Sequence, residues 1–118
     1  MSALLVGQPD LRRLALALAE VGPVAEAAVR AIIRIGGRTA YTDARARAPV
    51  RTGYMQSTVY VKYDTDGLGF ELGATADYTA FVEYGTVHMS PQPFIVPAFE
   101  QSVQVSEFAI NTMLARLL

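Results

Sequence analysis

Residues 58–72, which read TVYVKYDTDGLGFEL, decide the fold class of this 118-residue chain. Thr58–Tyr63 is rich in β-branched and aromatic residues, and Asp64–Gly67 is a typical turn sequence. In Leu68–Leu72, every second residue is a large apolar one. Two such runs separated by a polar turn are typical of a β-hairpin. We therefore predict two antiparallel strands near the middle of the chain.

Two helices are predicted before this hairpin. A run of leucine and alanine follows Pro9 and predicts a first helix that stops at Gly22. Pro23 suits the first turn of a second, longer helix, which we expect to run to Ala48 because Pro49 disfavours its continuation. Apolar side chains recur along this second helix: Val24, Ala28, Val29, Ile32, Ile33 and Ala40.

Two adjacent glycines, Gly36 and Gly37, lie inside the second predicted helix. Each glycine in a helix interior costs about 1 kcal/mol relative to alanine. A helix that contains both is expected either to kink at this point or to have a neighbour packed very close to its backbone.

Three shorter features follow the hairpin. Asp77 is placed to cap a short helix that ends at Gly85, because glycine most readily takes the left-handed conformation of a helix end. Residues 86–92 are predicted to form a loop, after which Pro93 or Pro97 opens a final helix. The apolar residues of these helices are Tyr78, Phe81, Val82 and Tyr84 in the short one, and Phe99, Val103, Ile110, Met113 and Leu117 in the last.

These elements predict an α+β fold with one domain over residues 1–118. Long N-terminal helices pack on a small antiparallel β-sheet, and a short middle helix and a C-terminal helix complete the core. The strand order stays open. The chain is 52% hydrophobic, which is enough for a core without disulfides or metals.

The composition excludes several classes of protein. The chain has no cysteine, which excludes a disulfide scaffold, a thiolate zinc site and a cysteine nucleophile. Charged residues interrupt every apolar run before it reaches the ~20 residues that span a bilayer. Arg12 and Arg13 follow the N-terminus too soon for a signal peptide. We expect a soluble protein that makes no membrane contact.

The charges are segregated along the chain, although the net charge is only −1. Between Lys62 and Arg116 every charged residue is acidic. Residues 30–51 contain a single acid, Asp43, and these basic residues: Arg30, Arg34, Arg38, Arg45, Arg47 and Arg51. Four of them, Arg30, Arg34, Arg38 and Arg45, fall on one side of the predicted helix and are called the arginine stripe below.

The arginine stripe has three interpretations. It suits docking of a basic surface on an acidic surface of another subunit or protein. It also suits an ordinary solvated helix face, or a small nucleic-acid-binding module that uses the basic helix. Aromatic residues for stacking on single strands are not interleaved with the arginines, which disfavours the last interpretation.

Patterns for catalysis or metal binding are sparse. His88 is the only histidine, so a hydrolase would have to be built around it, an alternative that a functional His88→Ala variant would eliminate. Asp64-x-Asp66-Gly67 superficially resembles a calcium loop, but Leu68 and Thr75 occupy ligand positions of that motif. We predict that the protein is not an enzyme and has no catalytic residues, cofactor or metal.

Three segments resemble a known family. Residues 44–57 (ARARAPVRTGYMQS), 78–86 (YTAFVEYGT) and 89–100 (MSPQPFIVPAFE) follow one another in the chain. In order and spacing they are similar to the small neck, head-tail joining and tail-completion proteins of tailed bacteriophages of the lambdoid siphophage type. Met55 stands where that family usually has leucine.

This resemblance implies a structural virion protein without catalytic residues. The expected protein forms a homo-oligomeric ring, hexameric or dodecameric, as a neck connector, tail-completion protein or tail terminator at the head-tail interface. Its implied partners are the head-closure or connector protein and the tail-tube or tail-completion proteins, with genome DNA passing through the channel without sequence-specific binding. It would occur in the virion, and in the host cytoplasm during assembly.

The motifs also have a physical interpretation. Pro49 ends the helix, and Thr52 and Gly53 turn the chain into the first strand. The loop that follows the short helix offers aromatic and apolar anchors of the type found at interface centres. These anchors are Tyr84, His88, Met89, Pro91 and Phe94. An ordinary core position is the alternative for Tyr84 and Phe94.

A closed ring needs two different surfaces on each subunit. A channel that DNA passes through is better neutral or acidic than lined by arginines, which would grip the phosphates. We therefore expect the six arginines of residues 30–51 to face an adjoining subunit or ring, and the acids Asp64, Asp66 and Glu71 to lie nearer the channel.

Overall fold

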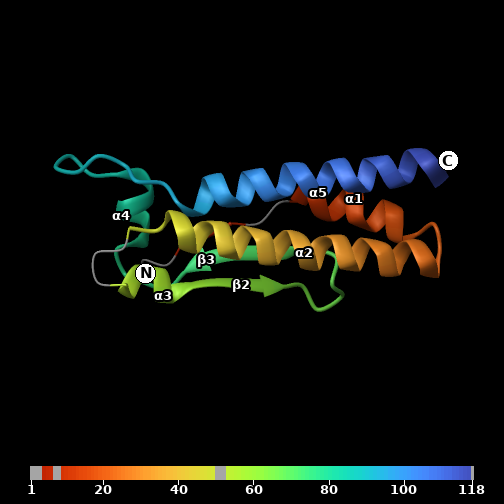
Figure 1. Cartoon of the computed structure of the whole chain (residues 1–118), viewed down its shortest axis with the longest axis horizontal. Helices are drawn as coiled ribbons and strands as arrows, with labels where there is room; N and C mark the ends of the chain where they lie inside the picture. Colours follow the sequence, from red (N-terminus) through yellow and green to blue (C-terminus); the bar gives the residue numbers. More distant parts are fainter. Residues whose placement is uncertain (1–3, 7–8, 50–52, 118) are drawn as a thin grey trace.

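The computed structural model describes residues 4–6, 9–49 and 53–117, and these form an elongated α+β body of 52 × 23 × 22 Å. Figure 1 shows two long helices running along the body, with the sheet on one side of them. The predicted fold class is confirmed. The elements are β1 (Leu4–Val6), α1 (Pro9–Ala19), α2 (Pro23–Arg47), α3 (Tyr54–Thr58), β2 (Val59–Tyr63), β3 (Phe70–Ala74), α4 (Thr79–Tyr84) and α5 (Ile95–Leu117).

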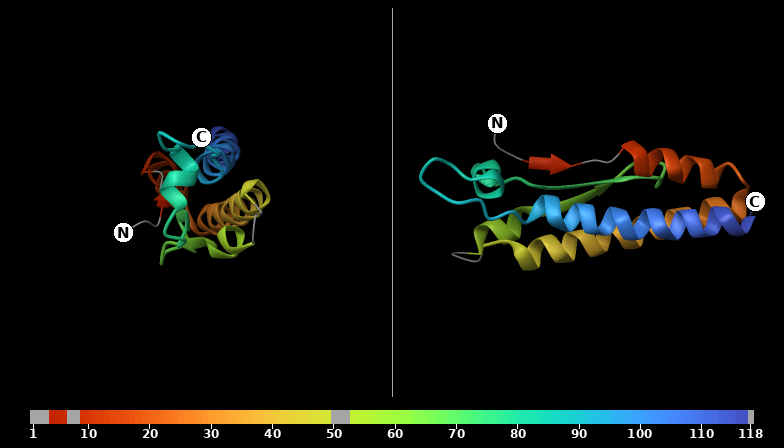
Figure 2. Two further views of the ribbon diagram at one scale, coloured as in Figure 1. Left: turned by 90° about the vertical axis from the view of Figure 1, so that its left-hand side faces the viewer. Right: turned by 90° about the horizontal axis from the view of Figure 1, so that it is seen from above.

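Helices α1 and α2 lie where the sequence predicts them, and α2 is central to the packing. Its buried side recurs every three or four residues and includes Val29, Ile33 and Ala40, none of which has any exposed surface. Figures 1 and 2 show α5 running along one side of α2 and the sheet along another. The core therefore forms around a single 25-residue helix.

The two glycines of α2 explain how it can be approached from two sides. A Cβ at Gly36 would lie 2.5 Å from Ser106 Oγ of α5, and a Cβ at Gly37 would lie 2.7 Å from the ring of Tyr63 on β2. The Ser102 hydroxyl donates to the Gly36 carbonyl oxygen. The predicted close packing is confirmed, and α2 continues through both glycines as one helix.

The predicted hairpin is confirmed, with β2 and β3 antiparallel and Tyr63 paired with Phe70. The sheet has three strands in the order β1-β3-β2, because Leu4–Val6 pairs with residues 72–74 of β3. We did not predict this strand. Three consecutive apolar residues show no alternation of apolar and polar side chains that would predict a strand. Their extended conformation depends on hydrogen bonding to β3.

Other details of the prediction need correction. Tyr78, not Asp77, occupies the position before α4, and no side chain caps that helix end. A further short helix, α3, intervenes between Gly53 and β2, so the chain does not turn directly into the strand. The last helix begins at Ile95, with Pro97 in its first turn. Phe99, Val103 and Ile110 of its apolar face are buried.

Candidate subunit-interface site

The loop between α4 and α5 is closed at its base by hydrogen bonds. The Gln92 N–H donates to the Val82 carbonyl oxygen at 2.8 Å, and Thr86 and Met89 form an isolated antiparallel bridge. Gly85 has φ +80°, and a Cβ there would lie 2.9 Å from the Met89 carbonyl oxygen and from Pro91. A glycine is required at this point because a side chain would prevent closure. Figure 1 shows the loop projecting from the end of the molecule opposite the C-terminus.

Glu83 connects α4 to the start of α5. Its carboxylate accepts the backbone N–H groups of Phe94 and Ile95 on Oε1, at 3.0 and 2.9 Å, and that of Val96 on Oε2, at 2.9 Å. These donors at a helix start have no partner within the helix itself, and the positive end of the helix dipole favours the carboxylate. Glu83 is only 3% exposed, so the three hydrogen bonds compensate for burying its carboxylate.

Sequence reasoning missed the role of Glu83. The only signal was an acid within an otherwise apolar helix, eleven to thirteen residues before the N–H groups that it binds. The contact links two of the three motifs that carry the family resemblance, residues 78–86 and 89–100. It holds the loop between them at both ends.

The predicted loop anchors divide into exposed and buried residues. Tyr84 is 62% exposed, and His88, Met89 and Pro91 are also exposed. Phe94 has no exposed surface, so its prediction as an interface anchor is wrong and the core alternative holds. The backbone of Phe94 is fixed by Glu83, which directs the chain from the loop into the body.

Exposed apolar side chains gather at this end of the molecule. The rings of Tyr54 and Tyr78 lie 6.3 Å apart, which brings α3 beside the start of α4. We call the following residues the loop-end patch: Tyr54, Tyr78, Phe81, Tyr84, Val87 and Met89. All six are exposed, which is unusual for so many large apolar side chains in one region.

The arginine stripe is partly neutralised within the protein. Arg30 forms an ion pair with Glu26 at 2.6 Å and donates to the Asp66 carbonyl oxygen at 2.9 Å. The Arg45 guanidinium lies 5.5 Å from the ring centre of Tyr41 and donates to its hydroxyl. Sequence reasoning missed the pairing of Arg30 because Glu26 precedes the basic segment by one helical turn.

The other predicted basic residues fall into three groups. Arg47 pairs with Asp43 at 3.0 Å and donates to Gln101 of α5 at 3.2 Å. Arg34 and Arg38 are exposed and form no ion pair with any described residue. Arg51 lies outside the described residues. The surface that stays cationic is therefore smaller than the sequence suggests.

Two of the three acidic candidates, Asp64 and Asp66, are paired with an arginine. Arg12 of α1 binds Asp64 and Asp66, each at 2.6 Å, and so anchors the β2–β3 turn on the first helix. The hydrogen bond from Arg12, together with one from the Leu68 N–H, lowers the pKa of Asp66 to about 2. Glu71 is half-buried and lies opposite Lys62 in the hairpin. Arg12 thus offsets one of the two negative charges at the turn.

Tyr63 connects the hairpin to α2. Its hydroxyl donates to the Arg34 carbonyl oxygen at 2.9 Å, three residues before Gly37, whose α-carbon its ring approaches closely. Burial raises the pKa of the Tyr63 phenol, against the opposing effect of Arg38 and Arg34. The phenol therefore stays protonated and continues to donate.

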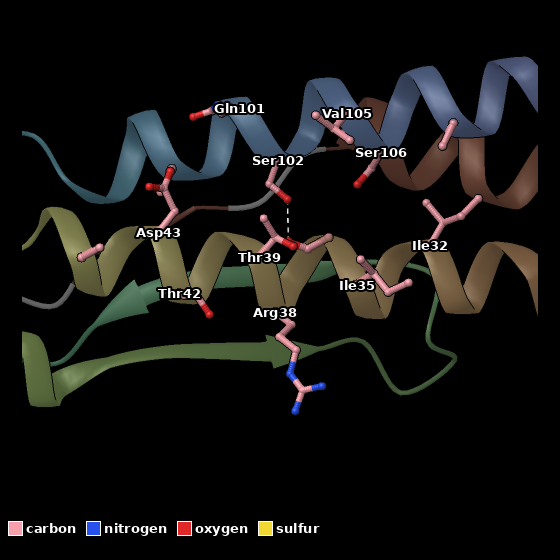
Figure 3. Close-up of a pocket in the computed structure, with 14 residues that line it drawn as sticks. Ile32, Ile35, Arg38, Thr39, Thr42, Asp43, Gln101, Ser102, Val105 and Ser106 are labelled. Atoms are coloured by element: carbon pink, nitrogen blue, oxygen red, sulfur yellow. Dashed lines mark hydrogen bonds between the residues drawn. The ribbon is translucent and has the colours of Figure 1, made fainter.

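A groove of about 810 Å³ runs between α2 and α5. Ile32, Ile35 and Val105 are its large apolar residues, and Figure 3 shows the residues that line it. Its other lining residues are mostly small, among them Gly36, Ala46, Ala98, Ser102, Ser106 and Ala109. Sequence reasoning missed this groove, although the small residues at helical spacing in both helices were its signal.

Side chains that could bind a metal ion or take part in catalysis are few among the residues that the structure describes. No three histidine, cysteine, aspartate or glutamate side chains there are placed to hold a metal ion. His88 is exposed in the loop, and its backbone N–H donates to the Thr86 hydroxyl. No helix in the described part of the chain is long and apolar enough to cross a membrane.

Comparison with known proteins agrees with the resemblance seen in the motifs. Residues 12–85 match the HK97-gp10-like family model, described as "Bacteriophage HK97-gp10, putative tail-component". No curated protein and no solved structure matches the chain. The match runs from Arg12, within α1, through α4, and it includes the arginine stripe, the hairpin and Glu83. It supports a structural role in the virion. The chain belongs to the HK97-gp10-like family of bacteriophage tail components.

Proposed function

We propose that this protein is a ring-forming subunit at the head-tail interface of a tailed bacteriophage, acting as a neck, tail-completion or tail-terminator protein. The observation that carries the proposal is that one protomer presents two different apolar surfaces, the loop-end patch and the α2/α5 groove. Association through two unlike surfaces generates a ring when the rotation between neighbours closes.

The exposure of both surfaces supports self-association. Val87 is 94% exposed and Tyr84 62%, and on the groove side Ile35 is 64% and Val105 66% exposed. Burying apolar surface contributes roughly 25 cal/mol per Å². A monomer gains nothing from leaving these side chains in water, whereas a closed ring would bury them in every subunit.

The charged residues have a proposed place in this ring. Arg34 and Arg38, which form no ion pair with the described residues, would meet an acidic surface of an adjoining subunit or of a connector or tail protein. Asp64, Asp66 and Glu71 would lie nearer the channel. Because Arg12 offsets one of the two negative charges of Asp64 and Asp66, DNA would meet a weakly acidic surface there, which does not grip its phosphates.

Electron microscopy of phage particles that lack this protein tests the proposal. Tailless heads beside separate finished tails are the expected result. The purified protein provides a second readout, in which light scattering and negative-stain images should reveal a closed oligomer. Particles that assemble normally without the protein would contradict a role in joining head and tail.

Charge reversal separates assembly from nucleic-acid binding. The double variant Arg34→Glu/Arg38→Glu should reduce the yield of joined particles, while Arg116→Glu, in the last turn of α5 and outside the arginine stripe, serves as the comparison. Normal particles from the double variant would refute the docking role of these arginines. Tight, salt-dependent DNA binding by the wild-type subunit, lost in the double variant, would favour a nucleic-acid-binding module instead.

A further inference from the structure

We propose that the loop of one copy, residues 85–92, inserts into the α2/α5 groove of the next copy. This inference rests on the proposed self-association and specifies which two surfaces meet. The partner is therefore a second copy of this chain, and the contact is made by a loop in a groove.

The loop is built to be presented as a preformed element. Its base is closed by the hydrogen bond between Gln92 and Val82, and the bridge between Thr86 and Met89 shapes its tip. Glu83 fixes the chain where it enters α5. A loop ordered before binding loses less conformational entropy on association.

The loop has the chemistry of a segment that becomes buried. Residues 84–99 contain no aspartate, glutamate, lysine or arginine, and His88 is their one titratable side chain apart from Tyr84. Val87, the most exposed large apolar residue of the described chain, lies near the tip. Burying this loop would remove apolar surface from water without desolvating a fixed charge.

The groove matches this chemistry. Its two charged lining residues are Arg38 and Asp43, and Figure 3 shows the Arg38 side chain directed away from α5. The Asp43 carboxylate is directed toward α5 and is paired with Arg47. No unpaired charge among the described residues therefore points into the groove, which suits an uncharged and apolar occupant.

The geometry favours insertion of the loop into the groove of a neighbouring copy over insertion into the groove of its own protomer. Figures 1 and 2 show the loop projecting from one end of the body, whereas the groove lies between the two long helices. Loop and groove are different surfaces, so each copy can give one and receive the other. This is the heterologous contact that a ring requires.

Site-directed cross-linking tests the proposal, because the natural chain has no cysteine. Full-length Val87→Cys protein is mixed with full-length Val105→Cys protein and treated with a short bismaleimide. A cross-linked dimer of the two is expected. The matched control is Val24→Cys, which is 84% exposed on α2 but lies outside the groove, and its link to position 87 should be markedly weaker.

A charge placed at the loop tip provides an independent measurement. Val87→Asp should weaken self-association, measured by light scattering against concentration, by about tenfold or more, because an unpaired carboxylate would enter an apolar groove. Val24→Asp should leave self-association unchanged. Circular dichroism would verify that both variants stay folded.

The outcomes distinguish failure of the inference from failure of the ring. If oligomers form but position 87 links to 105 no better than to 24, the loop does not enter the groove and the ring proposal survives. A strong link between two copies of Val105→Cys would also overturn the inference, because the groove faces would then meet each other. A protein that stays monomeric at every concentration would overturn both.

Discussion

The body around Gly36 and Gly37 and the end of the molecule around Glu83 are stabilised in different ways. In the body, side chains from α2, α5 and the sheet interlock, and Val29, Ile33 and Leu72 have no exposed surface. At the loop end, one buried carboxylate holds three backbone N–H groups while the apolar side chains of the loop-end patch stay in water.

Because of this difference, the residues that stabilise the fold are largely separate from the residues that are available to contact a partner. The body obtains its free energy of folding from apolar burial within one protomer. The loop end has a fixed backbone, but its apolar side chains contribute little to the stability of an isolated chain. A substitution in one region should therefore affect folding, and a substitution in the other should affect association, except at the few residues that fix the loop backbone.

The largest effect is expected at Glu83. Glu83→Ala leaves three N–H groups at the start of α5 without their acceptor and should lower the free energy of unfolding by about 3–4 kcal/mol. Glu83→Gln keeps one oxygen acceptor and should lose less. Chemical denaturation measures both, with exposed Glu100→Ala as the control. A Glu83→Ala protein as stable as wild type would show that the loop end needs no such support.

Gly37→Val tests the body and should cost about 2 kcal/mol, because the new side chain overlaps the ring of Tyr63. The hydroxyl of Tyr63 is bound to the Arg34 carbonyl oxygen, so the ring cannot move away freely. Ala27→Val, at an exposed position of the same helix, controls for the helix propensity of valine. In a Tyr63→Ala background the deficit of Gly37→Val should shrink, and an unchanged deficit would contradict the overlap.

Arg12→Met should cost about 1 kcal/mol at neutral pH, since its ion pairs with Asp64 and Asp66 are more than one third exposed to solvent. The pKa of Asp66 is about 2 in the folded protein, below its ordinary value of 3.8. The ionised Asp66 carboxylate therefore stabilises the folded protein fully above about pH 4, and this stabilisation is lost as the pH falls toward 2.

Unfolding experiments between pH 5 and pH 2 measure that contribution. The stability of wild type should fall more steeply over this range than that of Arg12→Met. Arg38→Met, which removes an arginine without an ion pair to the described residues, is the matched control and should keep the wild-type slope. Equal slopes for wild type and Arg12→Met would refute the role of this ion pair.

The smallest effect on folding is expected at the loop tip. Val87→Ser should change the free energy of unfolding by less than about 0.5 kcal/mol, because Val87 is almost fully exposed. The measurement is thermal or chemical denaturation at a concentration at which the protein is monomeric. A loss above 1 kcal/mol would show that the tip packs on its own body and would remove the distinction between the two regions.

Several features of the fold follow from local sequence. Proline and glycine at positions 22, 23 and 85 set helix boundaries through their own backbone preferences, and the residues of 58–72 specify a hairpin by alternation and turn chemistry. The motifs of residues 44–57 and 78–86 also indicated the family that the match to residues 12–85 confirms. Each of these signals depends on residues close together in the chain.

Tertiary structure alone decided the partners of individual side chains. Arg12 meets acids 52 and 54 residues away, and Ser102 meets Gly36 across 66 residues. Phe94 and Val87 are both apolar residues near one loop, yet the first is fully buried and the second is exposed. Burial and pairing depend on which distant elements pack together, whereas helix and turn preferences act within a few residues of the chain.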